Sequence, residues 1–344
     1  MDIYGSHPGL PQKRRPWFVV SLLIFVASVV FNIIFVVKYL WRAPRPLDDY
    51  QHLNLFPIVE NSLPNASDGQ HAVVTTLYTD SYAPAVATLG HSLRKVNTTA
   101  RLIVLYFPSV ISPSALCLAT ASGFEPVPVT RVAPPNDGNG MNAHFADVFT
   151  KLSLWGLDTM HIESLVYLDA DTLVVRNFDE LFHLPYTFAA APDVWEDDRG
   201  MTLEFNSGVL FLKPNSAVYE NMLSVLPYAR FPGFYADQAF LLQYFAGRTL
   251  TLPPIYNANL ATKKRYPQLW SGMHDEMRII HYTLAKPFIG RSFRDIPLES
   301  IPERVQEAAR SQHGLYYDEV ILWGTLWEET QLAYSHRLQE CGTR

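Results

Sequence analysis

Two carboxylates separated by a single residue, Asp169 and Asp171, interrupt an otherwise apolar run from Leu165 to Val175. Ionised carboxylates beside a hydrophobic core are costly unless a positive charge compensates them, and a divalent cation with oxygen ligands is the usual compensation. Alternate residues of an extended chain point to the same face, so this spacing suits two ligands of one metal ion. The alternative is a strand-to-loop turn with two solvated acids, and the motif alone does not decide between them.

The segments before these acids alternate between strand-like and helix-like patterns. Apolar, β-branched runs predict strands at 72–77, 101–106 and 125–132, and helical spacing of apolar residues predicts helices at 82–95, 113–122 and 149–160. The first two strands and the helix between them form a βαβ unit, which predicts a parallel pair. Two prolines suggest an edge position for the third strand. The acids therefore lie well inside an open α/β sheet, where ligands bind at the carboxyl ends of the strands.

No glycine-rich phosphate loop accompanies this pattern, because the sequence contains neither Gly-x-Gly-x-x-Gly nor Gly-x-x-x-x-Gly-Lys-Ser/Thr. A bound phosphate would instead need a metal ion and basic side chains. Polar residues recur downstream at the ends of predicted elements. They are Asp193 ending a strand at 188–193, Asn206 and Ser207 opening a strand at 205–212, Asp237 and Gln238 heading a helix, His281 ending a strand at 279–281, and Lys286 shortly after it.

In this order, the motifs resemble those of glycosyltransferase family 8, the glycogenin-like and galactosyltransferase-like retaining enzymes with a GT-A fold. The similar stretches lie at 149–155, 166–174, 190–193, 205–209, 237–238, 255–257 and 281–288. The resemblance implies an α/β fold with a Rossmann-like open, mostly parallel sheet and flanking helices over 71–296, followed by a C-terminal helical extension over 297–344. It also implies transfer of a hexose or N-acetylhexosamine from a UDP-sugar to a glycan or glycoconjugate acceptor.

By this resemblance, Asp169, Asp171 and His281 coordinate Mn²⁺, which bridges the diphosphate of the donor. Lys286 would contact the same diphosphate and supply a second positive charge to this leaving group. The mixed oxygen and imidazole set suits Mn²⁺ better than Ca²⁺. Departure of UDP places negative charge on a phosphate oxygen, and a metal ion stabilises that charge. The alternatives are a hydrogen-bonded core histidine at 281 and an ordinary surface lysine at 286.

The resemblance also assigns the remaining donor contacts and the reacting centre. The residues that hold uridine would be Thr76, Tyr78 and Tyr82. The residues that contact the donor sugar would be Lys151, Asp193 and Asn206, with Ala170 and Ser207 in the same donor-binding stretches. Asp237 and Gln238 match the positions beneath the anomeric carbon, where they would stabilise an oxocarbenium-like transition state. Framework tyrosines, helix-surface residues and a helix cap at position 237 are the structural alternatives.

Two stretches depart from the family pattern. Glycogenin-like members carry an extra acid and glycines before the Asp-Gln pair, whereas this chain has Phe-Tyr-Ala at 234–236, so its acceptor side differs. Many members have a glycine between the histidine and the lysine, whereas this chain has Thr-Leu-Ala at 283–285, which predicts a differently shaped loop over the diphosphate.

The N-terminal part of the chain has the pattern of a membrane anchor. The 21 residues from Trp17 to Val37 contain no charge, enough for a hydrocarbon core of about 30 Å. The segment is too long for the apolar region of a cleaved signal peptide, so we expect an uncleaved signal anchor at 17–37, a cytosolic tail at 1–16 and a stem at 38–70. Flanking basic residues tie at three to three. The glycosylation sequons at Asn65 and Asn97 break the tie and favour a lumenal domain in a single-pass type II Golgi protein.

The whole composition excludes some classes of function. The 344 residues have a formal net charge of -6 and no interior basic run of the kind that a nucleic-acid surface would need, which argues against a nucleic-acid partner. Cys117 and Cys341 are too few for a disulfide scaffold and lack zinc-site spacing, and whether they pair is left open. Homodimer formation is also left open. Trp323 and Trp327, four residues apart in a helical pattern, favour core or domain packing over a ligand site, and contact with the bilayer is left open.

Two other hypotheses compete with glycosyl transfer. A haloacid-dehalogenase-like phosphatase also places Asp-x-Asp after a strand. That signature requires Thr or Val two residues after the second acid, where this chain has Leu173, and it follows the first strand of its domain. The other hypothesis is a non-catalytic sugar-nucleotide-binding membrane protein, which the same donor-contacting residues would serve.

Overall fold

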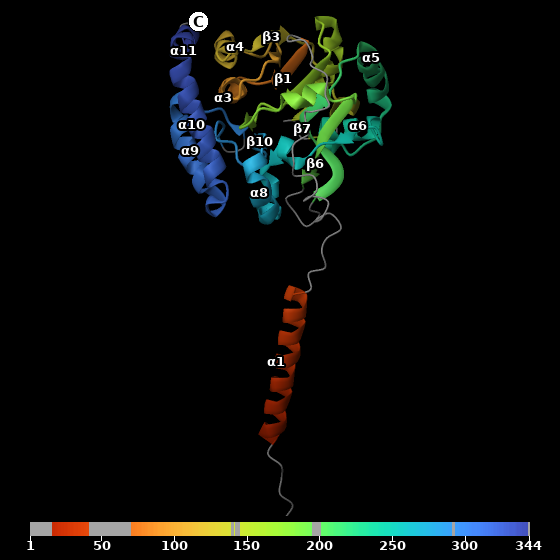
Figure 1. The fold of residues 1–344 in the computed structure, drawn as a ribbon, viewed down its shortest axis with the longest axis vertical. Coiled ribbons are helices and arrows are strands. Elements are labelled where there is room, and N and C mark those ends of the chain that lie inside the picture. The colour runs from red at the N-terminus through yellow and green to blue at the C-terminus, as the bar shows by residue number, and fades with distance from the viewer. Residues whose placement is uncertain are drawn as a thin grey trace, which may run out of the picture. The chain divides into compact units, whose positions relative to one another are not determined.

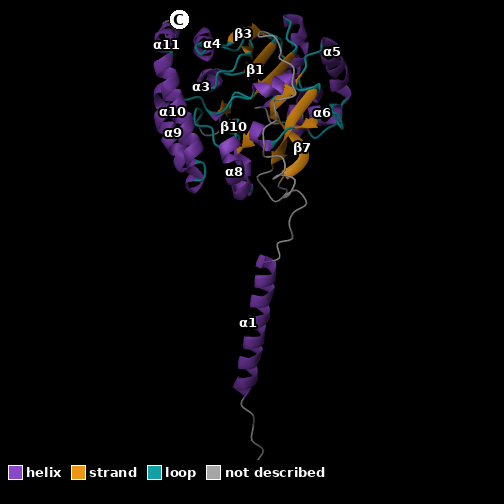
Figure 2. Ribbon diagram, in the orientation of Figure 1, coloured by secondary structure: helices purple, strands orange, loops and turns teal. Residues whose placement is uncertain are grey.

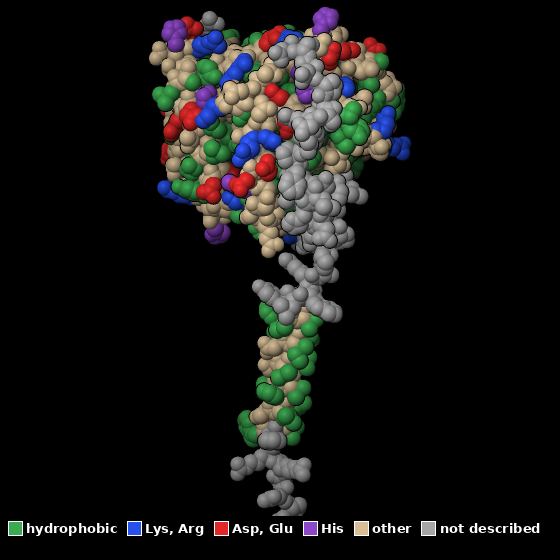
Figure 3. Space-filling view, in the orientation of Figure 1, with side chains coloured by type: hydrophobic (Ala, Val, Ile, Leu, Met, Phe, Trp, Pro, Cys, Tyr) green, Lys and Arg blue, Asp and Glu red, His purple; other side chains and the backbone are tan. Residues whose placement is uncertain are grey.

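The computed structural model describes residues 16–40, 70–138, 141, 145–194, 201–290 and 293–342. The chain divides into two compact units, 1–49 and 50–344, which we describe separately. The first contains helix α1 (Pro16–Leu40), drawn in red in Figure 1. Its stretch Val19–Val37 has the length and composition of a membrane span, and none of it is buried. Figure 3 shows hydrophobic side chains over the visible surface of this helix. The sequon residue Asn65 lies outside the described residues.

The second unit is built on a sheet of seven strands in the order β3-β2-β1-β4-β7-β6-β8 (Figure 2). The strands are β1 (His71–Leu77), β2 (Arg101–Tyr106), β3 (Glu125–Pro128), β4 (Ser164–Leu168), β6 (Phe188–Val194), β7 (Met201–Leu212) and β8 (Leu250–Thr251). β3, β2, β1 and β4 run parallel, which confirms the predicted βαβ pair and the edge position of β3. β7 runs antiparallel to both β4 and β6. The fold is thus of the α/β class, and its sheet is mixed but mostly parallel. The two acids follow the central strand β4.

A small second sheet brings the predicted histidine to the acids. It has the order β5-β10-β9, formed by β5 (Thr172–Val174), β10 (Ile279–His281) and β9 (Ala258–Asn259). β10 pairs with β5 in antiparallel register, with His281 opposite Thr172. Because Thr172 directly follows Asp171, this pairing carries the imidazole to the acid pair.

The apolar run 165–175 is therefore not one continuous strand. A turn separates β4 from β5, and the backbone N–H of Thr172 donates to the carbonyl oxygen of Asp169 at 3.0 Å. The expectation that an extended chain places both acids on one face is wrong. The turn itself presents both carboxylates, and its two arms are held by two different sheets.

Helices cover both faces of the large sheet (Figure 1). Alternate residues of β1 fall into two separate buried clusters, Val73 and Leu77 in one, Ala72 and Val74 in the other. The first cluster includes buried residues of α3 (Ala83–Lys95), α4 (Pro113–Thr120), α9 (Ile301–Arg310) and α10 (Tyr317–Ala333). The second includes residues of η5 (Val148–Met160), α5 (Ser216–Val225) and α6 (Ala236–Tyr244). The predicted helix at 149–160 is present, but as a 3₁₀ stretch.

The C-terminal helices belong to the core of this unit. The predicted C-terminal helical extension over 297–344 contains α9, α10 and α11 (Ser335–Gly342), and a break at Tyr334 separates the last two helices. Trp323 and Trp327 are each 1% exposed, and the Trp323 ring lies 5.6 Å from that of Phe288, which confirms their core role. Cys117 on α4 and Cys341 on α11 form a disulfide, which answers the question that the sequence left open. The short helices α7 (Leu260–Arg265) and α8 (Pro267–Met273) complete the unit.

Candidate active site

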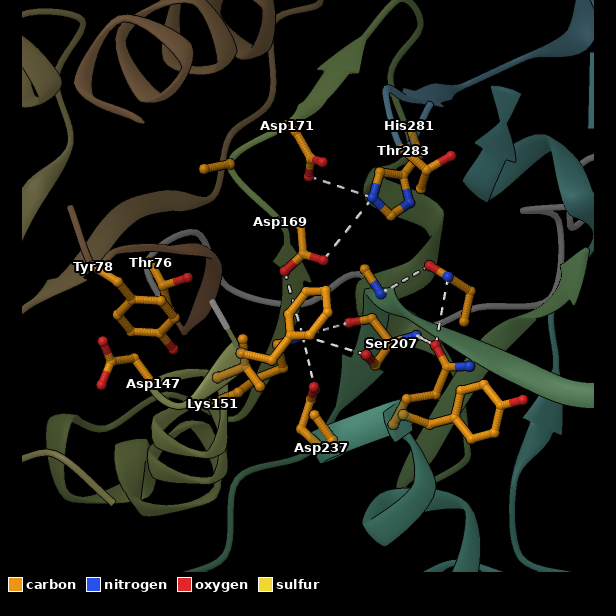
Figure 4. A pocket seen from close by; sticks show the side chains of 18 of the residues that line it. Thr76, Tyr78, Asp147, Lys151, Asp169, Asp171, Ser207, Asp237, His281 and Thr283 are labelled. Carbon is orange, nitrogen blue, oxygen red and sulfur yellow. Dashed lines mark hydrogen bonds and ion pairs between the residues drawn. The ribbon is translucent and has the colours of Figure 1, made fainter. Parts of the chain in front are cut away.

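A pocket of about 450 Å³ opens where β1, the β4–β5 turn, the start of α6 and the loop after β10 meet. Figure 4 shows its lining side chains. Every residue predicted to contact donor, metal or reacting centre lines it. These residues are Thr76, Tyr78, Tyr82, Lys151, Asp169, Ala170, Asp171, Asp193, Asn206, Ser207, Asp237, Gln238, His281 and Lys286. Segments more than 200 residues apart in the sequence thus converge on one cavity.

Asp169, Asp171 and His281 form a group that could hold a metal ion, since one ligand atom from each lies within 4.8 Å of the others. His281 Nε2 lies 3.3 Å from Asp171 Oδ1 and 3.9 Å from Asp169 Oδ2 (Figure 4). On the other side of the ring, Nδ1 lies 3.0 Å from Asn257 Oδ1. When Nδ1 carries the proton and donates it to the amide oxygen of Asn257, Nε2 keeps a lone pair that faces the two carboxylates. A cation held by the carboxylates could bind this lone pair. The donor set therefore fits a divalent metal.

Gly208 on β7 makes the position of His281 sterically feasible. A Cβ added at Gly208 would lie 2.1 Å from His281 Cε1, and no real Cβ contact is that short. The sequence pattern predicts a strand at 205–212 that opens with Asn206 and Ser207, and Gly208 is not among its candidate site residues. The neighbour of Gly208 is the ring of the predicted metal ligand, so this glycine positions the imidazole.

Lys286 Nζ contacts Asp171 Oδ2 directly. Burial on its own would raise the pKa of Asp171, but the charges of Lys286 and His281 hold that pKa well below its usual range. Asp171 is therefore ionised at neutral pH. Lys286 is not an ordinary surface lysine, because its side chain is 16% exposed and lies in this charge cluster.

Lys151 joins the acid pair to the predicted reacting centre. Its Nζ lies 2.9 Å from Asp237 Oδ2 and 3.3 Å from Asp169 Oδ1, and it donates to the carbonyl oxygen of Ser207 at 3.0 Å. Burial would lower the pKa of Lys151, but Asp169 and Asp237 raise it above its ordinary value, so the buried ammonium stays charged. These partners are all protein groups, and the contact of Lys151 with a donor sugar remains a prediction.

Asp237 lies in the first turn of α6, after the N-cap residue Tyr235. The alternative that Asp237 caps this helix is therefore wrong. Its neighbour Gln238 is held in one orientation, because Nε2 donates to Asp193 Oδ2 at 2.8 Å and Oε1 accepts from the backbone N–H of Ser207 at 3.1 Å. Asn206 Nδ2 donates to the other oxygen of Asp193 at 3.2 Å. The predicted sugar-side residues thus form one hydrogen-bonded network.

The tyrosines predicted for uridine lie at the mouth of β1. Tyr78 stacks on Phe107, with ring centroids 5.1 Å apart. Tyr82 meets Phe288 edge-on at 5.1 Å, and burial raises the pKa of Tyr82 to about 12. Both hydroxyls are therefore neutral at physiological pH. Each ring has protein partners as well as a place in the pocket lining, so framework and ligand roles are compatible here.

Comparison with known proteins identifies the family. The sequence matches the family described as glycosyl transferase family 8 over residues 73–288. The chain belongs to glycosyl transferase family 8. It is a glycosyltransferase by family, which contradicts the phosphatase hypothesis, whereas catalysis by this chain stays a prediction.

Known relatives agree with this assignment. The chain is 31% identical to glycogenin of Neurospora crassa over 62% of this chain and 30% of that protein. It is 32% identical to glycogenin-1 of Caenorhabditis elegans over 64% of this chain and 51% of that protein. It is 29% identical to galactinol synthase 1 of Arabidopsis thaliana over 71% of this chain and 78% of that protein. The chain thus spans only a third to a half of the two glycogenins.

The fold of the glycosyltransferase is of the predicted GT-A class. The apo structure of the bifunctional glycosyltransferase WbbM superposes with a TM-score of 0.50 at 17% identity, covering 77% of this chain and 53% of that one. The predicted α/β architecture, with a mostly parallel sheet and C-terminal helices, is confirmed.

Sequence reasoning missed three residues of this glycosyltransferase site. Tyr167 donates its hydroxyl to Asp169 Oδ1 at 2.6 Å and lies 3.0 Å from the hydroxyl of Thr76. Asn257 links His281 to Asn206, because its Nδ2 donates to Asn206 Oδ1 at 3.0 Å. Gly208 is the third. Tyr167 precedes Asp169 by two positions and Asn257 ends a motif shared with the family, so both could have been singled out.

Proposed function

We propose that this glycosyltransferase moves a hexose or an N-acetylhexosamine from a UDP-sugar to a glycan or glycoconjugate acceptor, with retention of anomeric configuration and with Mn²⁺ as cofactor. The observation that carries the proposal is the convergence of Asp169, Asp171 and His281 within 4.8 Å, beside the ammonium of Lys286. A diphosphate leaving group needs positive charge of this kind at one end of its pocket.

The three ligands combine carboxylate oxygen with imidazole nitrogen, a set that favours Mn²⁺ over Ca²⁺. When bound there, the metal would act as a Lewis acid on the departing diphosphate. Asn257 fixes the ring of His281 for this role, and Tyr167 fixes the carboxylate of Asp169. Such partners of metal ligands tune both orientation and basicity.

The donor would extend through the pocket from the tyrosines to the Asp193 network. Thr76, Tyr78 and Tyr82 are assigned to uridine, and Lys286 adds positive charge at the diphosphate. The sugar would then meet Asp193, Asn206 and Gln238, whose amide and carboxylate groups are already oriented by mutual hydrogen bonds. A site held in this way loses little reorganisation energy on binding.

Transfer breaks the bond between the anomeric carbon and the β-phosphate oxygen, and UDP leaves with the bonding electrons. The acceptor oxygen forms the new bond to the same carbon and passes its proton to the departing phosphate oxygen, so that the charges balance. Positive charge develops on the sugar ring in between, and we assign Asp237 and Gln238 to its stabilisation. Lys151 would hold Asp237 in place, since its ammonium lies between Asp237 and Asp169.

We also propose that the chain is a single-pass type II Golgi protein with this domain in the lumen. Helix α1 has the length and composition of a membrane span. The disulfide between Cys117 and Cys341 is typical of an oxidising compartment. The sequon residue Asn97 is exposed, at the end of α3.

A donor screen tests the proposed chemistry. The detergent-solubilised full chain is incubated with UDP-glucose, UDP-galactose, UDP-N-acetylglucosamine or UDP-N-acetylgalactosamine, and UDP release is measured with Mn²⁺ and with chelator. We expect Mn²⁺-dependent release from at least one donor, reduced at least about 100-fold in Asp169→Asn or Asp171→Asn. Asp275→Asn is the matched control, because Asp275 is an exposed carboxylate outside both the pocket lining and the metal group. Undiminished release in either ligand variant would contradict the metal role.

A further inference from the structure

Exposed phenylalanines gather at the pocket. Among the described residues after α1, three phenylalanine side chains are more than a third exposed: Phe145 at 37%, Phe234 at 67% and Phe293 at 45%. All three line the pocket, although they come from three separate segments of the chain. A single exposed apolar side chain needs no explanation, but several around one cavity mark a binding surface.

The backbone ties one of these rings to the reacting centre. Phe234 and Tyr235 form an edge-to-face pair with centroids 5.2 Å apart, in the short helix η8 (Gly233–Tyr235). The next residue, Ala236, is buried and has φ 48° and ψ -127°, a backbone conformation that residues with a side chain rarely adopt. Asp237 follows directly.

Strain of this kind persists only where the surrounding structure enforces it, and it concentrates at functional sites. The strained residue Ala236 therefore links the aromatic pair of Phe234 and Tyr235 on one side to the predicted reacting pair on the other. Phe234 thus lines the pocket three residues before Asp237, which is assigned to the reacting centre.

We propose that Phe234, supported by Tyr235 and Phe293, forms a platform for a pyranose ring of the acceptor, so that the acceptor hydroxyl is presented by a sugar. This inference rests on the proposed function. A pyranose has one face of C–H groups and an edge of hydroxyls, and a flat aromatic ring packs on the C–H face while leaving the hydroxyls free. The hydrogen-bonding network of Asp193, Asn206 and Gln238 lies deeper in the pocket, where the donor sugar is assigned.

The test separates transfer from hydrolysis in the full chain. With the donor found in the screen, UDP release is measured in water alone and with methyl glucoside, methyl galactoside, lactose, maltose, cellobiose or mannobiose as acceptor probes. We expect Phe234→Ala to raise the acceptor KM about 10-fold, with a much smaller effect on hydrolysis. Phe234→Leu should show the same loss, because it keeps an apolar side chain but no flat face, and Phe234→Trp should retain transfer.

Tyr228→Ala is the matched control, since Tyr228 is an aromatic residue that is 83% exposed and does not line the pocket. Wild-type KM in Phe234→Leu, or an equal fall of hydrolysis and transfer in Phe234→Ala, would overturn the platform. So would hydrolysis by the wild type without transfer to any of the sugar probes. Absence of both hydrolysis and transfer would instead refute the proposed function, and the platform with it.

Discussion

Gly208 determines how closely His281 approaches the acid pair. An added methyl group would occupy space 2.1 Å from His281 Cε1 and 2.9 Å from Asn206 Oδ1. We therefore expect Gly208→Ala to displace the imidazole and to weaken the apparent affinity for Mn²⁺ by about 10- to 100-fold, as loss of a residue that orients a metal ligand does. Metal titration of UDP release measures this effect.

Gly156→Ala is the control for that substitution, because a Cβ at Gly156 would lie 3.4 Å from the Tyr219 ring, an ordinary contact. It should leave the metal titration unchanged. An unshifted titration in Gly208→Ala would show that the close approach of Gly208 does not determine the position of His281.

At the scale of single residues, the sequence predicted the side chains that carry chemistry better than those that position them. Asp169, Asp171 and His281 have side chains whose chemistry is visible in their type, and motif order placed them together. Gly208 and Asn257 act through contacts between distant segments, which neither periodicity nor composition reveals. The lysine at 151 was predicted at the site, but its burial between two acids could only be found from the structure.

At the scale of elements, the turn between β4 and β5 was hidden in the sequence. Both arms are apolar and buried, so their pattern predicts one strand, whereas each arm pairs in a different sheet. The pairing of β5 with β10 joins residues about 100 positions apart. Local propensity cannot specify such long-range register, although it located β1, β2, β6 and α3 within a few residues.

The contact between α3 and α10 allows a prediction at the same scale. Glu329 Oε2 accepts from Lys95 Nζ at 2.7 Å and lies 3.3 Å from His91 Nε2. The hydrogen bond from Lys95 lowers the pKa of Glu329 below its ordinary value. A carboxyl group with a lowered pKa in the folded state stabilises the fold above its unfolded pKa of about 4.3, and this contribution is lost as the pH falls through the folded value.

We therefore expect Glu329→Gln to lower the free energy of unfolding at pH 7 by less than about 1 kcal/mol, because the pair is largely exposed. The difference from wild type should shrink below pH ~4. Thermal unfolding across this pH range measures it. Glu328→Gln, at the exposed neighbouring position, controls for the change in net charge. A difference that grows as the pH falls would contradict this assignment of the pair.

At the scale of the whole molecule, the C-terminal helices are part of the catalytic unit's core. Trp323 packs on Phe288, two residues beyond Lys286, and the hydroxyl of Tyr282 donates to the backbone of Glu319 at 2.7 Å. Helix α10 thus supports the loop that carries Lys286. The sequence predicted the helices and the burial of the tryptophans, but only the structure shows that this support reaches the site.

The arrangement of the whole chain across a membrane is the remaining prediction. Helix α1 supplies an apolar segment, and Asn97 supplies an exposed acceptor for N-glycan in the second unit. If that unit is lumenal, the full chain expressed in eukaryotic cells should remain in the membrane pellet after carbonate extraction and should lose mass on treatment with peptide-N-glycosidase. Asn97→Gln should remove one glycan's mass, whereas Asn221→Gln, at an exposed asparagine outside any sequon, should not. Glycosylation of a sequon added to the N-terminal tail would contradict this orientation, because it would show that the N-terminal end of α1 lies in the lumen.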